Sequence, residues 1–184
     1  MSFLGPDTAT ILVSAAFATV VLGAGGALTE IGPWYVQLRK PSWQPPNWLF
    51  APAWTLIAIL AVVAAVFAWD MARDAAGRTE IIVLFVINGV LNMAWSLLFF
   101  KLRRPDWALV EVALLWLSIA ALMVGLASMS VRASWLLLPY LLWVSFASVL
   151  NWKIVQLNQP FRRRAAMQTT KELGARRDAD VQPA

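Results

Sequence analysis

Cysteine and histidine are both absent from the 184 residues of this chain. Without cysteine there can be no disulfide, thiol nucleophile, Cys/His zinc site or c-type haem attachment. Without histidine there is no imidazole to serve as a general base or as a ligand to haem iron. Methionine, tyrosine and carboxylates could still reach an iron, but none of them forms a recognisable ligand pattern. We therefore predict no metal site.

Charge is also scarce, since 14% of the residues are charged and 60% are hydrophobic. A helix needs about 20 apolar residues to cross a bilayer, and five segments meet that need: residues 8–28, 48–71, 81–100, 107–129 and 135–157. A helix satisfies its own backbone polar groups, which hydrocarbon cannot do. The sequence predicts an all-α membrane protein, with a bundle of five transmembrane helices forming one domain over residues 1–158.

Lysine and arginine are unevenly distributed between the two ends of this bundle. The N-terminal side holds three of the fifteen cations: Arg73, Arg78 and Arg132. The other side holds twelve: Arg39, Lys40, Lys101, Arg103, Arg104, Lys153, Arg162, Arg163, Arg164, Lys171, Arg176 and Arg177. The positive-inside rule then predicts a cytoplasmic C-terminus and favours the cytoplasmic membrane. The net charge of +5 is thus a sign of topology and not of nucleic-acid binding.

The C-terminal residues 159–184 are basic and polar, without apolar periodicity. Such a composition is typical of a disordered segment, and we predict a disordered cytoplasmic tail. Its run Arg162–Arg164 could also contact anionic membrane lipid.

The connection between the first two spans, residues 29–47, is rich in aromatic residues and proline; we call it the aromatic loop. Trp34, Tyr35 and Trp43 lie within it, and Trp48 follows it. Prolines fix the backbone and remove donors, so this loop could hold aromatic faces over an apolar ligand. Alternatively, these residues form an interfacial belt at headgroup depth.

Polar and aromatic residues share faces within the spans. Asn88, Asn92, Trp95 and Phe99 follow one helical face, as do Tyr140, Trp143, Ala147 and Asn151. Polar groups in hydrocarbon are costly, so they mark either a ligand site or interhelical hydrogen bonds. Glu111 is the carboxylate that lies well inside a span.

Two further patterns concern helix packing. Pro52 and Pro139, near the starts of two spans, each remove a backbone hydrogen bond and could open room between helices. In the first span a stripe of small residues is either a close contact inside the monomer or a homodimer seam. Its members are Ala15, Thr19, Gly23 and Ala27.

The chain resembles the translocator protein family, also called tryptophan-rich sensory protein or TspO/MBR. The matching motifs are Trp34-Tyr35, Lys40-Pro41-x-Trp43-x-Pro45-Pro46-x-Trp48, Trp54, Asn92-x-x-Trp95, Phe99-Phe100, Trp107-Ala-Leu, Pro139-Tyr140-x-x-Trp143 and Leu150-Asn151. They cover about residues 10–158. The resemblance implies a five-helix bundle, often dimeric, with a ligand cavity beneath the first loop. Family ligands include porphyrins such as protoporphyrin IX, haem, cholesterol and synthetic benzodiazepine-type drugs. The resemblance also allows a location in an outer membrane.

Carried over to this sequence, the resemblance implies a cavity lined by Trp34, Trp43, Trp54, Asn92, Trp95, Trp107, Tyr140, Trp143 and Ala147. We add Asn151, Arg39 and Lys40, whose amide and cations suit porphyrin propionates. The family often has an aromatic residue one turn after Trp54, where this chain has Ala58, which predicts a wider cavity or another ligand. The proposed sterol motif lacks its central tyrosine here, which argues against a sterol.

Three functions remain open from the sequence. The first is binding of porphyrin-like ligands with a transport or sensory role, with no required cofactor and with the porphyrin as ligand. The second is an enzyme that degrades protoporphyrin IX in light, for which Trp54 and Trp143 would be the catalytic residues. The third is a scaffold that acts through partners. Membrane lipid and a second copy of the chain are the expected partners.

Overall fold

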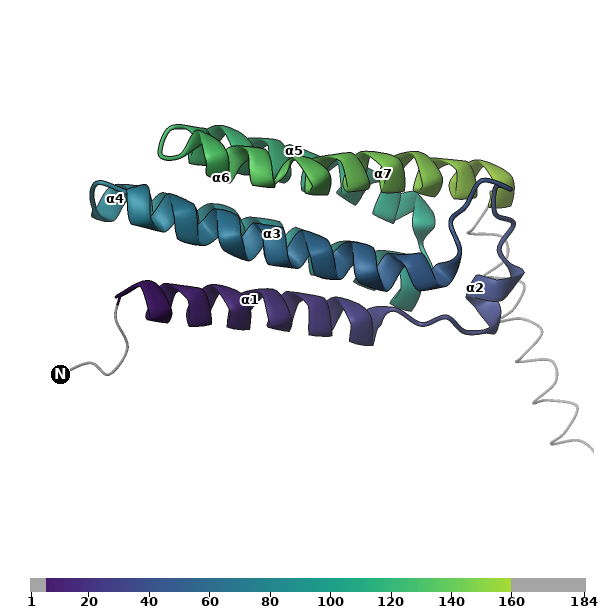
Figure 1. Ribbon diagram of the computed structural model, residues 1–184. Coiled ribbons are helices and arrows are strands. Elements are labelled where there is room, and N and C mark those ends of the chain that lie inside the picture. The colour runs from purple at the N-terminus through teal and green to yellow at the C-terminus, as the bar shows by residue number, and fades with distance from the viewer. Residues whose placement is uncertain (1–5, 160–184) are drawn as a thin grey trace, which may run out of the picture.

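A computed structural model describes residues 6–159, with side chains from Thr8 onward. The predictions for residues 160–184 of the tail lie outside this part of the chain. Five long helices form a bundle: α1 (Pro6–Leu28), α3 (Phe50–Met71), α4 (Ala75–Ser96), α5 (Pro105–Ala127) and α7 (Leu138–Asn158) (Figure 1). Each belongs to a segment that is long and apolar enough to cross a membrane. The predicted class is confirmed: a multi-pass helical membrane protein.

Four short elements modify this plan. The aromatic loop contains a five-residue helix, α2 (Pro33–Gln37), and a 3₁₀ turn, η1 (Asn47–Leu49), leads into α3. A π-helical turn, η2 (Leu97–Lys101), ends α4, and α6 (Val131–Leu136) precedes α7. Insertions of this π type are rare and occur often at functional sites.

Helix boundaries differ from the hydropathy prediction where polar chemistry extends a helix. The third span begins at Ala75 and not near residue 81, because Asp74 caps α4 by accepting from the Gly77 N–H at 2.9 Å. The fifth span begins at Val131 and is divided at Leu137. Pro139 lies in the first turn of α7, where its missing N–H costs no helical bond. We predicted that Pro139 removes a hydrogen bond within the span. The proline instead lies at the start of a helix.

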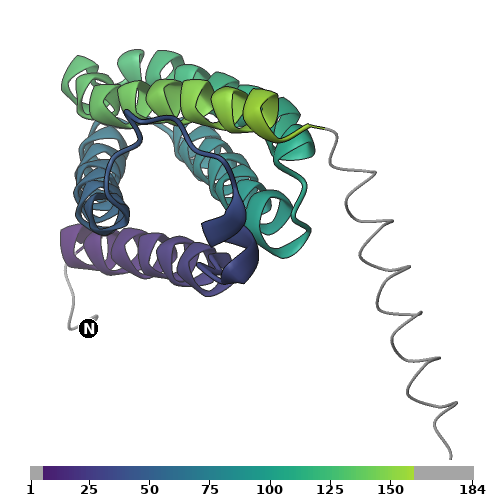
Figure 2. The same ribbon diagram turned by 90° about the vertical axis from the view of Figure 1, so that its right-hand side faces the viewer.

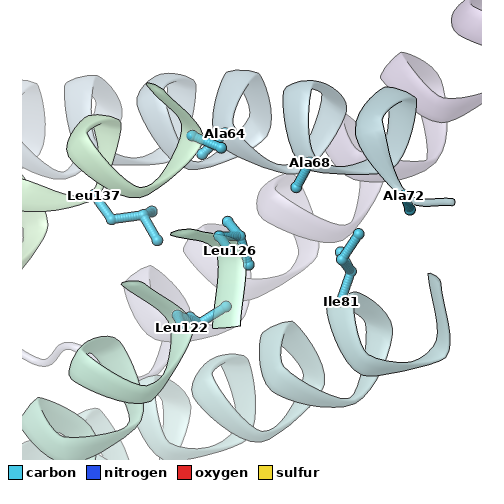
Figure 3. Packing of buried hydrophobic residues seen from close by; sticks show 8 residues of the cluster. Ala64, Ala68, Ala72, Ile81, Leu122, Leu126 and Leu137 are labelled. Atoms are coloured by element: carbon cyan, nitrogen blue, oxygen red, sulfur yellow. The ribbon is translucent and has the colours of Figure 1, made fainter. Parts of the chain in front are cut away.

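The helices surround the interior of the bundle (Figure 2). α1 packs on α3 and α4, α5 packs on α4 and α7, and α6 closes the far end by packing on α3 and α5. At that end a cluster of small and branched residues is fully buried, including Ala64, Ala68, Leu122 and Leu126 (Figure 3). Alanines on α3 let the neighbouring helices approach closely, which fixes this end of the bundle.

The outward faces of the long helices are apolar, as hydrocarbon contact requires. Val20, Val110 and Val124, for example, are each more than 60% exposed. The small-residue stripe of α1 also faces outward, since Thr19, Gly23 and Ala27 are exposed. Among the described residues, no heavy atom beyond the adjacent backbone of α1 lies within 4 Å of a Cβ added at Gly23. The alternative of a close contact inside the monomer is therefore wrong at Gly23, while the homodimer seam stays a prediction.

Candidate functional site

The aromatic loop crosses one end of the bundle (Figure 2). Its aromatic rings pack edge-on or tilted against rings of the bundle. The Trp34 and Phe99 centroids are 6.1 Å apart, and those of Trp43 and Phe146 are 5.9 Å apart. Tyr35 packs on Phe100 at 5.6 Å. Aromatic pairs in this range contribute about 0.5–1.5 kcal/mol beyond area burial, so the loop is docked on η2 and α7.

Tyr35 is the centre of the loop's own hydrogen bonds. Its hydroxyl donates to Asn47 Oδ1 at 3.3 Å and accepts from Gln44 Nε2 at 3.2 Å. The Lys40 ammonium lies 3.6 Å from the centre of the Tyr35 ring, in a cation–π contact. Burial raises the pKa of the Tyr35 hydroxyl and lowers the pKa of Lys40. The loop therefore has a fixed internal structure.

Asn158, at the end of α7, ties this loop to the bundle. Its Oδ1 accepts from the Arg39 N–H at 2.9 Å, and its Nδ2 donates to the Arg39 carbonyl at 2.8 Å. The same Nδ2 donates to the Ile154 carbonyl at 2.8 Å, and the side chain is 1% exposed. Sequence reasoning missed this residue, because its partner is a backbone segment 119 residues away.

A second contact, an ion pair, lies at the start of the loop. Glu30 forms an ion pair with Lys101 of η2. The hydrogen bond from Lys101, together with its charge, lowers the pKa of the Glu30 carboxyl. Both side chains are exposed, so this pair adds little stability.

Beneath the loop lies a cavity of about 430 Å³, which we call the loop-capped cavity. Its volume falls in the range of about 300–1,000 Å³ typical of small-molecule sites. Residues of all five long helices and of the loop line it. The lining residues predicted from the sequence are Trp54, Asn92, Trp95, Trp143, Ala147 and Asn151, and others include Tyr35, Phe50, Phe99 and Val144.

Indole side chains from three helices line this cavity. Trp54 comes from α3, Trp95 from α4 and Trp143 from α7. The Trp95 ring stacks on Phe99 at 5.1 Å, and Phe50 holds Trp143 at 5.5 Å. Within the described chain, the indole N–H groups of Trp95 and Trp143 are buried without a hydrogen-bond partner. Buried donors are nearly always satisfied in proteins, so these two could serve a polar group of a ligand.

The polar residues of the spans are joined in a network between helices. Asn92 Nδ2 donates to the Tyr140 hydroxyl at 2.9 Å, and that hydroxyl donates to Asn88 Oδ1 at 3.2 Å. Asn88 Nδ2 in turn donates to Ser118 Oγ at 2.9 Å. The network links α4, α5 and α7, as the interhelical alternative for these asparagines predicts.

Asn151 also acts between helices. With its amide turned to suit both partners, it donates to the Pro105 carbonyl and accepts from the Leu109 N–H, each at 3.1 Å. These are the backbone groups of the first turn of α5. Asn151 is 2% exposed and thus positions α5 against α7 while forming part of the cavity wall.

The remaining predicted residues lie outside the loop-capped cavity. Tyr140 lines a neighbouring cavity that shares Trp54 and Asn92 with it. Trp34 and Trp43 belong to the loop that covers it, and Arg39 and Lys40 lie on that loop without lining either cavity. Trp107 is a correction: it lines neither cavity and is 57% exposed at the start of α5.

Glu111 is buried and lines neither cavity. Both of its carboxyl oxygens lack a hydrogen-bond partner among the described residues. Buried polar side chains nearly always have a partner in proteins, so Glu111 is an exception among the described residues of this bundle.

Comparison with known proteins agrees with this architecture. A profile of the TspO/MBR family matches residues 10–157. The chain belongs to the TspO/MBR family. The tryptophan-rich protein TspO of Chlorobaculum tepidum is 45% identical over 127 residues, which cover 68% of this chain and 79% of the relative.

Other family members are similar over most of their length. The tryptophan-rich protein TspO of Archaeoglobus fulgidus is 37% identical over 150 residues, 80% of this chain and 96% of the relative. The translocator protein of Bos taurus is 35% identical over 142 residues, 75% of this chain and 82% of the relative. The TspO/MBR similarity thus covers the whole helical bundle.

Proposed function

We propose that this TspO/MBR protein binds porphyrin-type ligands in the loop-capped cavity and uses them in sensing or transport across the membrane. The observation that supports this most is the set of indoles from α3, α4 and α7 around one cavity beneath a docked aromatic loop. Flat aromatic ligands stack well on such faces, as bases do on aromatic side chains. Relatives named tryptophan-rich sensory protein and translocator protein support the sensing or transport role.

The mode of binding follows from the missing histidine and cysteine. Haem iron is usually held by His, Cys, Met or Tyr. No methionine is among the described residues that line the loop-capped cavity. The two tyrosines, Tyr35 and Tyr140, are engaged in hydrogen bonds of the loop and of the interhelical network. Recognition would then depend on the aromatic walls and on the indole N–H donors, with no axial bond to iron.

The test compares metal-free protoporphyrin IX with haem by titration of the purified protein. We expect the two dissociation constants to agree within a few-fold, and we expect no low-spin six-coordinate spectrum in the haem complex. A haem affinity higher by about a hundredfold, or roughly 2.7 kcal/mol, would require an iron ligand and would contradict this binding mode. Absence of saturable binding of either ring would contradict the proposed function itself.

Light-dependent oxidation of a bound porphyrin is the second candidate. The observation that favours it is that Trp54 and Trp143 both line the loop-capped cavity, where an indole would lie beside an excited ring. Illumination of the protoporphyrin complex, with a dark control, separates the two candidates. Product that forms repeatedly, with more than one turnover per protein, would indicate an enzyme.

We also propose that the end of the bundle with the aromatic loop faces the cytoplasm. The loop, the connection between η2 and α5, and the end of α7 all lie at this end (Figure 1). They carry the cation excess that the positive-inside rule assigns to the cytoplasm.

A reporter fused to the C-terminus should therefore be active in the cytoplasm, and one fused to the N-terminus should be active outside it. The pair of fusions is its own control, since five spans require opposite results at the two ends. A C-terminal reporter that is active only outside the cytoplasm would refute this orientation.

A further inference from the structure

A second cavity of about 380 Å³ lies in the half of the bundle away from the aromatic loop; we call it the distal cavity. It is bounded by α1, α3 and α4, and by Tyr140 of α7. It shares only Val21, Leu22, Trp54 and Asn92 with the loop-capped cavity, so the two lie end to end with these residues between them. The proposed function makes no use of this space.

Small residues of α3 create the distal cavity. Ala58, Ala61 and Ala65 line it along one helical face, with Trp54 at one end and Trp69 at the other. Fifteen residues separate the two indoles, which corresponds to about 22 Å along the helix. The distal cavity thus extends along α3, past these small side chains. Ala58, where the family often has an aromatic residue, therefore widens the distal cavity.

The rim of the distal cavity is formed by residues that are themselves exposed. Val13 of α1 is 70% exposed, and Ile82 and Val86 of α4 are 51% and 44% exposed. All three belong to membrane-spanning segments. The exposed rim therefore adjoins hydrocarbon chains of the bilayer and not water.

The lining excludes polar ligands. No charged residue lines the distal cavity, and most of its lining side chains are aliphatic or aromatic. Asn88, Asn92 and Tyr140 lie at its wall but are hydrogen-bonded to one another. Other polar groups of the lining include the hydroxyls of Thr10 and Ser14 on α1. A charged or strongly polar ligand would lose its hydration without compensation here. A hydrocarbon chain has no polar group to desolvate and would not meet this penalty.

We propose that the distal cavity binds a hydrocarbon chain that enters from the bilayer between α1 and α4. This hydrocarbon chain belongs either to a membrane phospholipid or to a free fatty acid, and the chemistry of recognition is the same for both. The Trp54 indole, packed on Tyr140 at 5.9 Å, separates this chain from the loop-capped cavity. This site does not depend on porphyrin binding in the other cavity.

The test uses the full chain in lipid nanodiscs that contain a probe with a diazirine in its acyl chain. One arm uses phosphatidylcholine and the other uses a free fatty acid. After photolysis, mass spectrometry locates the label on α3. Ala65 lines the distal cavity and is 8% exposed, whereas Val63 lines neither cavity and is 37% exposed. Labelling at Ala65 should saturate as the probe fraction rises, while labelling at Val63 should increase in proportion to it.

Saturable labelling in one arm identifies the source of the chain. Filling the cavity with Ala61→Phe should abolish labelling at Ala65, and the control Ala113→Leu, on the exposed face of α5, should leave it unchanged. The wild-type comparison of Ala65 with Val63 decides the matter even if the filled variant does not fold. Absence of saturable labelling at Ala65 in both arms, or its persistence in folded Ala61→Phe, would overturn the proposal.

Discussion

Trp143→Ala should weaken the binding of protoporphyrin IX by about tenfold or more, because the variant removes one of the three indole faces of the loop-capped cavity. Removal of an aromatic side chain that stacks on a nucleobase costs about 1–3 kcal/mol, and a porphyrin offers a larger face. Phe50 and Phe146 hold the Trp143 ring at 5.5 and 5.7 Å, so the indole is already oriented before a ligand binds. Fluorescence titration of the purified variant measures the effect.

The matched control is Trp135→Ala, which removes the same side chain from α6. Trp135 is 63% exposed and lines neither cavity. Its variant should bind protoporphyrin IX with the wild-type affinity, and Trp143→Phe should recover much of the lost affinity. Equal losses in the two alanine variants would show that the effect comes from destabilisation of the bundle and not from a lost ring contact.

Much of the fold could be predicted because a bilayer allows few solutions. Five apolar segments of sufficient length require five helices, and the structure has them. Hydropathy could not place the start of α4, because residues 75–80 include Arg78, Thr79 and Glu80 and no large apolar residue. The Asp74 cap holds this turn in the helix. Nor could it show α2, which is only five residues long.

The candidate site could be predicted where residues recur on one face of a long helix. Trp143, Ala147 and Asn151 line the loop-capped cavity from one face of α7, as their spacing predicts. The prediction that Trp107 lines the cavity was wrong, because the buried face of α5 contains Ala108, Val112 and Leu115. Trp107 instead shares the exposed face with Val110 and Leu114. The match to a family motif singled out Trp107 but did not show which side of the helix it lies on.

Asn158 shows a second limit of sequence reasoning. It lies seven residues after Asn151 and so continues the same face of α7. Its partner, however, is the backbone of Arg39, which any residue at that position could supply. Contacts between a side chain and a distant backbone leave no signal in a single sequence. The structure shows, however, that this asparagine bonds the aromatic loop to α7, in addition to the ring contact of Trp43 with Phe146.

Asn158→Ala should loosen the aromatic loop and accelerate the release of protoporphyrin IX. The two hydrogen bonds to Arg39 contribute about 1 kcal/mol each, so their loss should favour the open loop by about 2 kcal/mol, or roughly 30-fold. The dissociation rate should rise by a similar factor, since a ligand beneath a docked loop leaves when the loop opens. Stopped-flow fluorescence after addition of a porphyrin-binding competitor measures this rate.

Amide hydrogen exchange gives a direct structural readout of the same change. The Arg39 N–H is bonded to Asn158 and should exchange faster in Asn158→Ala, whereas the amide of Ala108 within α5 should keep its protection. The control is Gln159→Ala, because Gln159 is the exposed neighbour of Asn158, whereas both side-chain bonds to the Arg39 backbone come from Asn158. If Arg39 exchanged at the wild-type rate in Asn158→Ala, the loop would be held by its aromatic contacts alone. Faster porphyrin release with unchanged Arg39 exchange would place the exit elsewhere than under this loop.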